Sequence, residues 1–142
     1  MNEQALHSLA YSSRAVPGMS SRAARHELHN DAMTRNAAFE ITGLLIYVEG
    51  QFVQLLEGPR KRVLDLFQRI QTDSRHYDVS LIAESAVTKR AFDAWSMALC
   101  EFEEEAVDAQ SQIRTAIAEA RELGTLTPLT ALESILLRMK RN

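Results

Sequence analysis

Two apolar segments joined by a two-residue turn lie near the middle of the chain, at residues 41–48 and 51–56. The first, from Ile41 to Val48, is rich in β-branched and apolar residues, which are typical of strands. Glu49-Gly50 is a tight-turn dipeptide, and the strand-like pattern resumes at Gln51. The sequence therefore predicts a β-hairpin, and any fold proposed for this chain must contain it.

The segments around this hairpin complete an ordered series of elements. Three more segments have the short apolar runs of strands, and two have apolar residues at the three-to-four-residue spacing of helices. The expected elements are a strand over 6–11, a helix that follows a cap at Ser20 or Ser21 and ends at Asn36, a helix from 63 to about 73, and strands over 79–87 and 95–102.

The resulting order, βαββαββ, predicts an α+β fold of the ferredoxin-like type, an antiparallel sheet with two helices on one face. Beyond residue 102 the composition changes to two amphipathic helical stretches, separated by Gly124 and Thr127-Pro128, which are typical end and start signals. We therefore expect a sheet domain at 1–102 and a C-terminal two-helix extension at 103–142.

Composition excludes several classes of protein. The 142 residues carry a net charge of −3, whereas a nucleic-acid-binding domain would be basic. Cys100 is the only cysteine, so the chain forms no internal disulfide. Neither a signal peptide nor an apolar stretch of membrane-spanning length is present. We expect a cytoplasmic protein that binds neither membrane nor nucleic acid, and no metal ligand set stands out.

Polar residues at apolar positions suggest where a site could lie. Gln54 lies on the same strand face as Phe52 and Leu56, and a buried amide without partners costs about 1–3 kcal/mol. Tyr11 ends the first strand, which commonly pairs with the third in this fold, and Asn36 ends the first helix. Taken singly, the tyrosine is most often a core residue and the asparagine a helix-end residue. Together they predict a polar group of side chains on the helix-covered face of the sheet.

Several short motifs in register then give the chain a family resemblance. They are Tyr11-Ser12-Ser13, Arg35-Asn36, Ile41-Thr42-Gly43, EGQFVQLLEG at 49–58, Asp73-Ser74-Arg75-His76, Arg90-Ala91-Phe92 and Trp95-Ser96-Met97. In this order, the motifs resemble those of the BLUF family, blue-light sensors that bind a flavin, usually FAD. The match runs from about residue 6 to about residue 100.

The resemblance implies a flavin site between the two helices, with FAD bound and FMN or riboflavin as alternatives. Residue by residue, the family's flavin contacts fall on Asn36, Gln54, Arg69, Asp73, Ile41, Phe52 and Tyr11. It also implies a photochemical role for Tyr11, Gln54, Trp95 and Met97, because excitation of the flavin is followed by proton-coupled electron transfer from the tyrosine and a changed hydrogen bond at the glutamine.

The implied function is a sensor without enzymatic turnover. The last strand and the C-terminal helices would pass the signal to a partner protein, or to self-association in a homo-oligomer. The helices' apolar stripes favour a covering subunit, although the same stripes could simply cap the open face of the sheet. A ferredoxin-like binding or oligomerisation module without photoactivity is the alternative, and purified protein distinguishes the two by its colour and light response.

Overall fold

A computed structural model describes residues 5–48, 50–93, 96–102, 109–122, 124 and 126–140. The predicted order of elements is confirmed in this part of the chain. The elements are β1 (Leu6–Ala15), the 3-10 turn η1 (Pro17–Ser20), α1 (Arg22–Ala38), β2 (Thr42–Val48), β3 (Gln51–Pro59), α2 (Arg60–Ile70), β4 (His76–Val87), β5 (Ala98–Phe102), α3 (Ala109–Glu122) and α4 (Pro128–Lys140).

The helices begin and end for local reasons visible in the sequence. The Ser21 hydroxyl accepts a hydrogen bond from the Ala24 amide at 3.1 Å, which caps α1 as predicted. Thr127 caps α4 in the same way, because its hydroxyl accepts from the Thr130 amide at 3.2 Å. The second helix ends at Ile70, a turn earlier than expected, and the Asp73 amide still bonds to the Ile70 carbonyl at 3.0 Å.

The strands form one five-stranded sheet in the order β4-β1-β3-β2-β5. Neighbours run antiparallel except β2 and β5, which pair in parallel, so the expectation of a wholly antiparallel sheet is wrong at this edge. The reason is the route of the chain between β4 and β5. Those two strands lie at opposite edges of the sheet, and β5 enters alongside β2 rather than returning in a hairpin.

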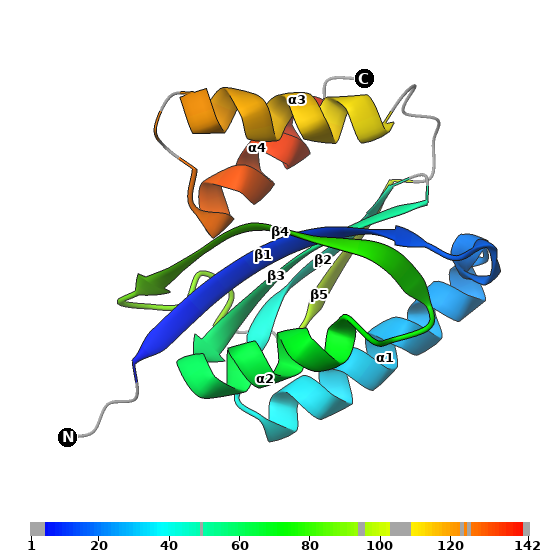
Figure 1. Cartoon of the computed structure of the whole chain (residues 1–142). Helices are drawn as coiled ribbons and strands as arrows, with labels where there is room; N and C mark the ends of the chain where they lie inside the picture. The colour runs from blue at the N-terminus through cyan, green and yellow to red at the C-terminus, as the bar shows by residue number, and fades with distance from the viewer. Residues whose placement is uncertain are drawn as a thin grey trace.

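Two layers of helices cover the sheet, with α1 and α2 on one face and α3 and α4 on the other (Figure 1). Each face has its own core of buried apolar side chains. On the α3–α4 face, the buried helical residues are Ala116, Ala131, Leu132 and Ile135, packed with the sheet residues Ile46 and Leu55. The stripes that favoured a covering subunit therefore cap this chain's own sheet, as the alternative interpretation held.

No helix among the residues described is both long enough and apolar enough to cross a membrane.

Candidate functional site

The first and third strands bring together two polar side chains on the face covered by α1 and α2. Tyr11 of β1 lies directly opposite Gln54 of β3 in the antiparallel pairing. Both are buried, at 3% and 4% exposure. The Tyr11 hydroxyl donates a short hydrogen bond to Gln54 Oε1, so the amide has the partner that its burial requires.

The other end of the same amide contacts the segment that leads into β5. Gln54 Nε2 lies 3.4 Å from the Met97 sulfur and donates to it. Met97 is 2% exposed and belongs to the core on the α1–α2 face. Gln54 therefore bridges the phenol of Tyr11 and the thioether of Met97, and any change in the orientation of its amide alters both contacts.

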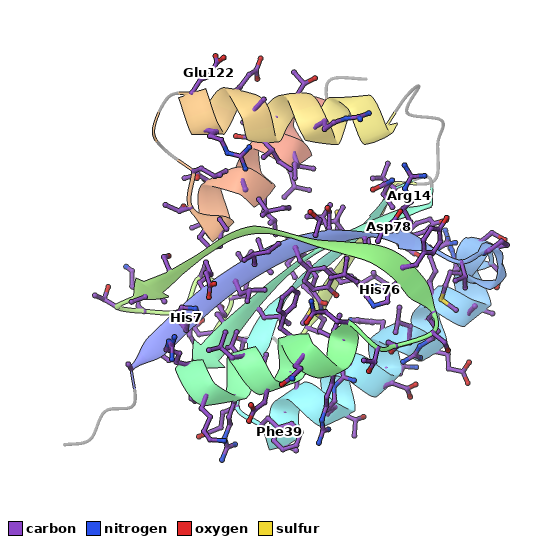
Figure 2. The ribbon with its side chains drawn as sticks, in the orientation of Figure 1. His7, Arg14, Phe39, His76, Asp78 and Glu122 are labelled. Carbon is purple, nitrogen blue, oxygen red and sulfur yellow. The ribbon has the colours of Figure 1, made fainter. Side chains whose placement is uncertain are left out.

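A cavity of about 30 Å³ lies beside this bridge, between the sheet and the helices. Gln54, Tyr11 and Phe52 form its sheet side, and the α1 residues Leu28, Ala32 and Arg35 form one wall. Asp73, Arg75 and His76, which follow α2, form another. Figure 2 shows the His76 side chain between the sheet and the helices.

The His76 ring is held by a hydrogen bond at each of its two nitrogens. Its Nε2 lies 2.7 Å from the Ile70 carbonyl oxygen, which can only accept, so this nitrogen carries the hydrogen. Its Nδ1, 2.7 Å from the Ser13 hydroxyl, then accepts from that hydroxyl. The ring also packs edge-on against Tyr11 and Phe52. It thereby connects the polar end of the cavity to Tyr11, one of the residues with a predicted photochemical role.

Charged residues line the end of the cavity away from the sheet. Arg75 Nη2 lies 2.8 Å from Asp73 Oδ2, and its Nη1 lies 3.2 Å from Asp31 Oδ2 on α1. The hydrogen bond from Arg75 lowers the pKa of the Asp73 carboxyl, although burial opposes the effect, and the same pairing raises the pKa of Arg75. These ion pairs join the end of α2 to α1 across the cavity.

Arg35 is a lining residue to which the sequence analysis gave no role. Burial lowers the pKa of its guanidinium, while Asp73 partly offsets that loss. Its Nε is buried and has no hydrogen-bond partner among the described residues. The signal that could have identified it is its position directly before Asn36, one residue from a predicted contact.

Asn36 carries the second unsatisfied atom of this region. It is fully buried, and its Nδ2 donates to the Ser96 carbonyl at 3.2 Å. Its Oδ1 accepts nothing from the described part of the chain. A buried acceptor left without a donor is costly, and it marks a place where a ligand N–H would be stabilised.

Burial also raises the pKa of the Tyr11 phenol well above its usual value, and the nearby Arg35 charge only partly offsets this rise. The hydroxyl therefore keeps its proton at physiological pH. The hydroxyl donates this proton in its hydrogen bond to Gln54 Oε1.

The remaining predicted site residues lie in different places. Arg69 does not line this cavity but a separate hollow of about 360 Å³, together with Phe39 at the end of α1 and Leu66. Figure 2 shows Phe39 at the outer end of these helices. Ile41 is buried in the same core but does not line the cavity, and Trp95 lies outside the described residues.

Comparison with known proteins identifies the family of this chain. The sequence model of a family described as "Sensors of blue-light using FAD" matches residues 6–98. Over 96 residues the chain is 38% identical to the photoactivated adenylate cyclase subunit beta of Euglena longa, an alignment that covers 67% of this chain and 11% of the relative. It is also 37% identical over 65 residues to the blue light- and temperature-regulated antirepressor BluF of Escherichia coli, covering 45% of this chain and 16% of the relative. The chain thus spans about a tenth of the length of the cyclase relatives.

Solved structures resemble more of the chain. The dark-state structure of BlrB, a BLUF protein, has a TM-score of 0.67 and 26% identity, with 98% of each chain covered. A bacterial light-regulated adenylyl cyclase reaches a TM-score of 0.69 at 26% identity, covering 84% of this chain and 36% of that one. Because the family model spans most of the chain and the site supplies the facing tyrosine and glutamine, the chain belongs to the BLUF family of blue-light sensors.

Proposed function

We propose that this chain senses blue light through FAD bound between α1 and α2, against the Tyr11–Gln54 pair. The observation that carries the proposal is the hydrogen-bonded series Tyr11–Gln54–Met97 beside a cavity lined by Arg35, whose Nε is unsatisfied among the described residues. An amide in this position links two strands and can exchange its donor and acceptor ends by rotation. An aliphatic side chain in its place would have nothing to rearrange.

The residues present fit a flavin in chemistry. The imide edge of the ring system offers an N–H and two carbonyl oxygens, which match the unsatisfied Asn36 Oδ1 and Arg35 Nε. Phe52 and Leu45 offer apolar contacts on the sheet side. Ligand pockets usually have about 300–1,000 Å³, so the 30 Å³ cavity must widen to admit the ring system.

Five side chains would hold the ring. Asn36 and Arg35 would bind its polar edge from α1, and Asp73 and Arg69 would bind from α2 and the turn after it. Phe52 would pack on the ring from β3. Ile41, which is buried in the same core, would support the site without lining the cavity.

When bound, FAD would supply the blue absorption and, once excited, an oxidant that would accept one electron from Tyr11. The Tyr11 hydroxyl passes its proton toward Gln54 Oε1 along the hydrogen bond that already joins them. Gln54 is left in a different orientation or tautomer, and its bond to the Met97 sulfur changes with it. No net oxidation of the protein remains after the proton and electron return to Tyr11.

The signal would leave the pocket through Met97 and β5, which lead toward α3 and α4. A single rearranged hydrogen bond changes the free energy by only about 0.5–1.5 kcal/mol, so the responding element must already be close to balance. We propose a contact with a partner protein, or self-association, as the output. The relatives named above as photoactivated cyclases are consistent with a module that signals to something outside itself.

The decisive experiment is spectroscopic. Purified protein titrated with FAD, FMN and riboflavin should turn yellow and bind FAD, and blue light should shift its flavin band to longer wavelength, with recovery in darkness. A colourless protein that takes up none of the three would instead indicate a binding or oligomerisation module without photoactivity. Steady oxidation of NADH would contradict a sensor without turnover.

A further inference from the structure

Side chains of α1 contact residues 96–102, here called the output segment, at two separate places. At its start, Asn36 Nδ2 donates to the Ser96 carbonyl at 3.2 Å, and His29 Nε2 donates to the Met97 carbonyl at 2.7 Å. Both are single hydrogen bonds to backbone carbonyls, made next to the residue that contacts Gln54.

The second place lies at the far end of β5. Arg25 Nε donates to Glu101 Oε2 at 2.7 Å, and His26 Nε2 lies 3.3 Å from Glu101 Oε1. The Arg25 side chain is 4% exposed and that of Glu101 is 13% exposed. Glu101 comes four residues after Met97 and one before Phe102, where β5 ends.

Arg25 is itself fixed on three other sides. Its Nη1 donates to the carbonyl oxygens of Met19 at 3.1 Å and Ser20 at 2.8 Å. Its guanidinium carbon lies 4.1 Å from the centre of the Tyr47 ring, on β2. The guanidinium is thus joined to η1, β2 and β5 at once, and it cannot follow Glu101 without losing several contacts.

The two places differ in strength. Hydrogen bonds between charged groups are roughly twice as strong as neutral ones. The hydrogen bond from Arg25 to Glu101 joins charged groups, whereas the hydrogen bonds to the Ser96 and Met97 carbonyls have neutral acceptors. Burial alone would raise the pKa of the Glu101 carboxyl. The hydrogen bonds from Arg25 and His26 outweigh this effect and hold the pKa below its usual range. The carboxylate therefore remains charged, and the far end of β5 is the firmer of the two attachments.

We infer that Glu101 is a positioning residue that keeps β5 in its dark-state register against α1. A displacement at Met97 reaches α3 and α4 only when the ion pair between Glu101 and Arg25 breaks. The inference rests on the proposed function, because it identifies the interaction that a light-induced displacement of β5 must break. Glu101 lies four residues after Met97, toward the C-terminal helices. It therefore acts on the output and not on the photochemistry at Gln54.

The test uses the full chain loaded with FAD and compares the wild type with Glu101→Gln. The amide preserves the shape of the side chain but removes its charge. Two readouts are taken in darkness and under blue light: the flavin absorption band, and hydrogen exchange of the backbone amides in α3 and α4. We expect an unchanged dark band and red shift, with dark-state exchange in the two helices about tenfold faster and close to the lit wild-type rate.

Glu84→Gln is the matched control. Glu84 is a carboxylate on β4, at the opposite edge of the sheet, and it lies 2.8 Å from His7. This variant removes the same charge from a carboxylate that is hydrogen-bonded to a neighbouring strand, and its helices should exchange at wild-type rates. A second variant, Arg25→Met, removes the contact with Glu101 together with the contacts to η1 and Tyr47, so its exchange should be at least as fast as that of Glu101→Gln, and adding Glu101→Gln to it should change little.

The outcomes separate this inference from the proposed function. Wild-type exchange in Glu101→Gln, in darkness and in light, would overturn the positioning role, and so would loss of the red shift in that variant. A wild-type protein that shows no red shift defeats the proposed function, whatever the exchange data show. Should Glu101→Gln not fold, Glu101→Asp carries the same test, because its shorter side chain keeps the charge and lengthens the contact.

Discussion

Tyr11 and Gln54 face each other across neighbouring strands, and the phenol donates its hydrogen bond to the amide oxygen. This direct pairing needs no loop to bring the two groups together. The sheet itself fixes their separation, and each is buried to within a few per cent of complete. A proton passing from one to the other therefore meets a prearranged acceptor, which lowers the reorganisation that a light response requires.

Gln54→Leu should keep the flavin bound and abolish the red shift. Leucine has a similar volume, but it can neither accept from Tyr11 nor donate to Met97. The buried Tyr11 hydroxyl then lacks its partner, so we expect a loss of about 1–3 kcal/mol in the free energy of unfolding. Absorption spectra in darkness and light test the first expectation, and urea unfolding tests the second. A normal red shift in this variant would show that the amide is not the relay.

Tyr11→Phe should remove a pH dependence of stability as well as the normal light response. Burial raises the pKa of the phenol in the folded chain, while the unfolded chain ionises near pH 10. The stabilisation is fully present below pH 10 and is lost as pH rises, because only the unfolded state then gives up the proton. Between pH 9 and pH 11, the wild type should lose about 1 kcal/mol more than the variant.

Urea unfolding at the two pH values measures this difference, and the comparison cancels the titration of other groups that both proteins share. Equal losses in the two proteins would mean that the Tyr11 hydroxyl is accessible to solvent. Tyr77→Phe serves as the control for loss of a phenol hydroxyl at the surface, because Tyr77 is 49% exposed on β4.

Much of this architecture was predictable because local patterns and tertiary structure agree. The hairpin at Gly50, the Ser21 cap and the start of α4 at Pro128 all appear where the sequence indicates them. Pairing of the first and third strands followed from the fold class, and it placed Tyr11 against Gln54. The division at residues 102 and 103 stays a prediction.

The errors arose where the outcome depends on distant segments. No local pattern shows that β5 pairs in parallel with β2, because this depends on where the connection from β4 crosses the sheet. The α1 pattern did not show that Arg25 would be buried, since its carboxylate partner lies 76 residues away at Glu101. Arg35 was passed over for the same reason, because its burial comes from residues following α2.

Asn36→Ala should weaken flavin binding by at least about tenfold. The change removes the unsatisfied Oδ1 and also the hydrogen bond from Nδ2 to the Ser96 carbonyl. Fluorescence titration with FAD measures the affinity. Asn30→Ala, an exposed change on the same helix, should bind like the wild type, and unchanged affinity in Asn36→Ala would remove this residue from the site.

Met97→Leu should change the lifetime of the lit state more than the stability of the fold. The substitution nearly conserves volume in a buried position, which usually costs less than about 1.5 kcal/mol. It removes the sulfur that accepts from Gln54 Nε2, so one orientation of the amide loses a partner. Dark recovery of the flavin band should differ from the wild type by severalfold, and an identical recovery rate would show that the sulfur contact has no part in the photocycle.

Gly43→Ala should prevent the site from forming. A methyl group at this position in β2 would lie 1.9 Å from the Leu55 carbonyl oxygen and 3.3 Å from the Met97 methyl carbon. Because Leu55 belongs to the neighbouring strand, β2 and β3 would have to separate next to Gln54. We expect destabilisation of several kcal/mol, at the upper end for single substitutions, and little flavin bound. Gly18→Ala is the matched control, since nothing lies within 4 Å of the added carbon, and it should unfold within about 0.5 kcal/mol of the wild type. Equal stability of the two variants would mean that β2 and β3 do not approach as closely as described.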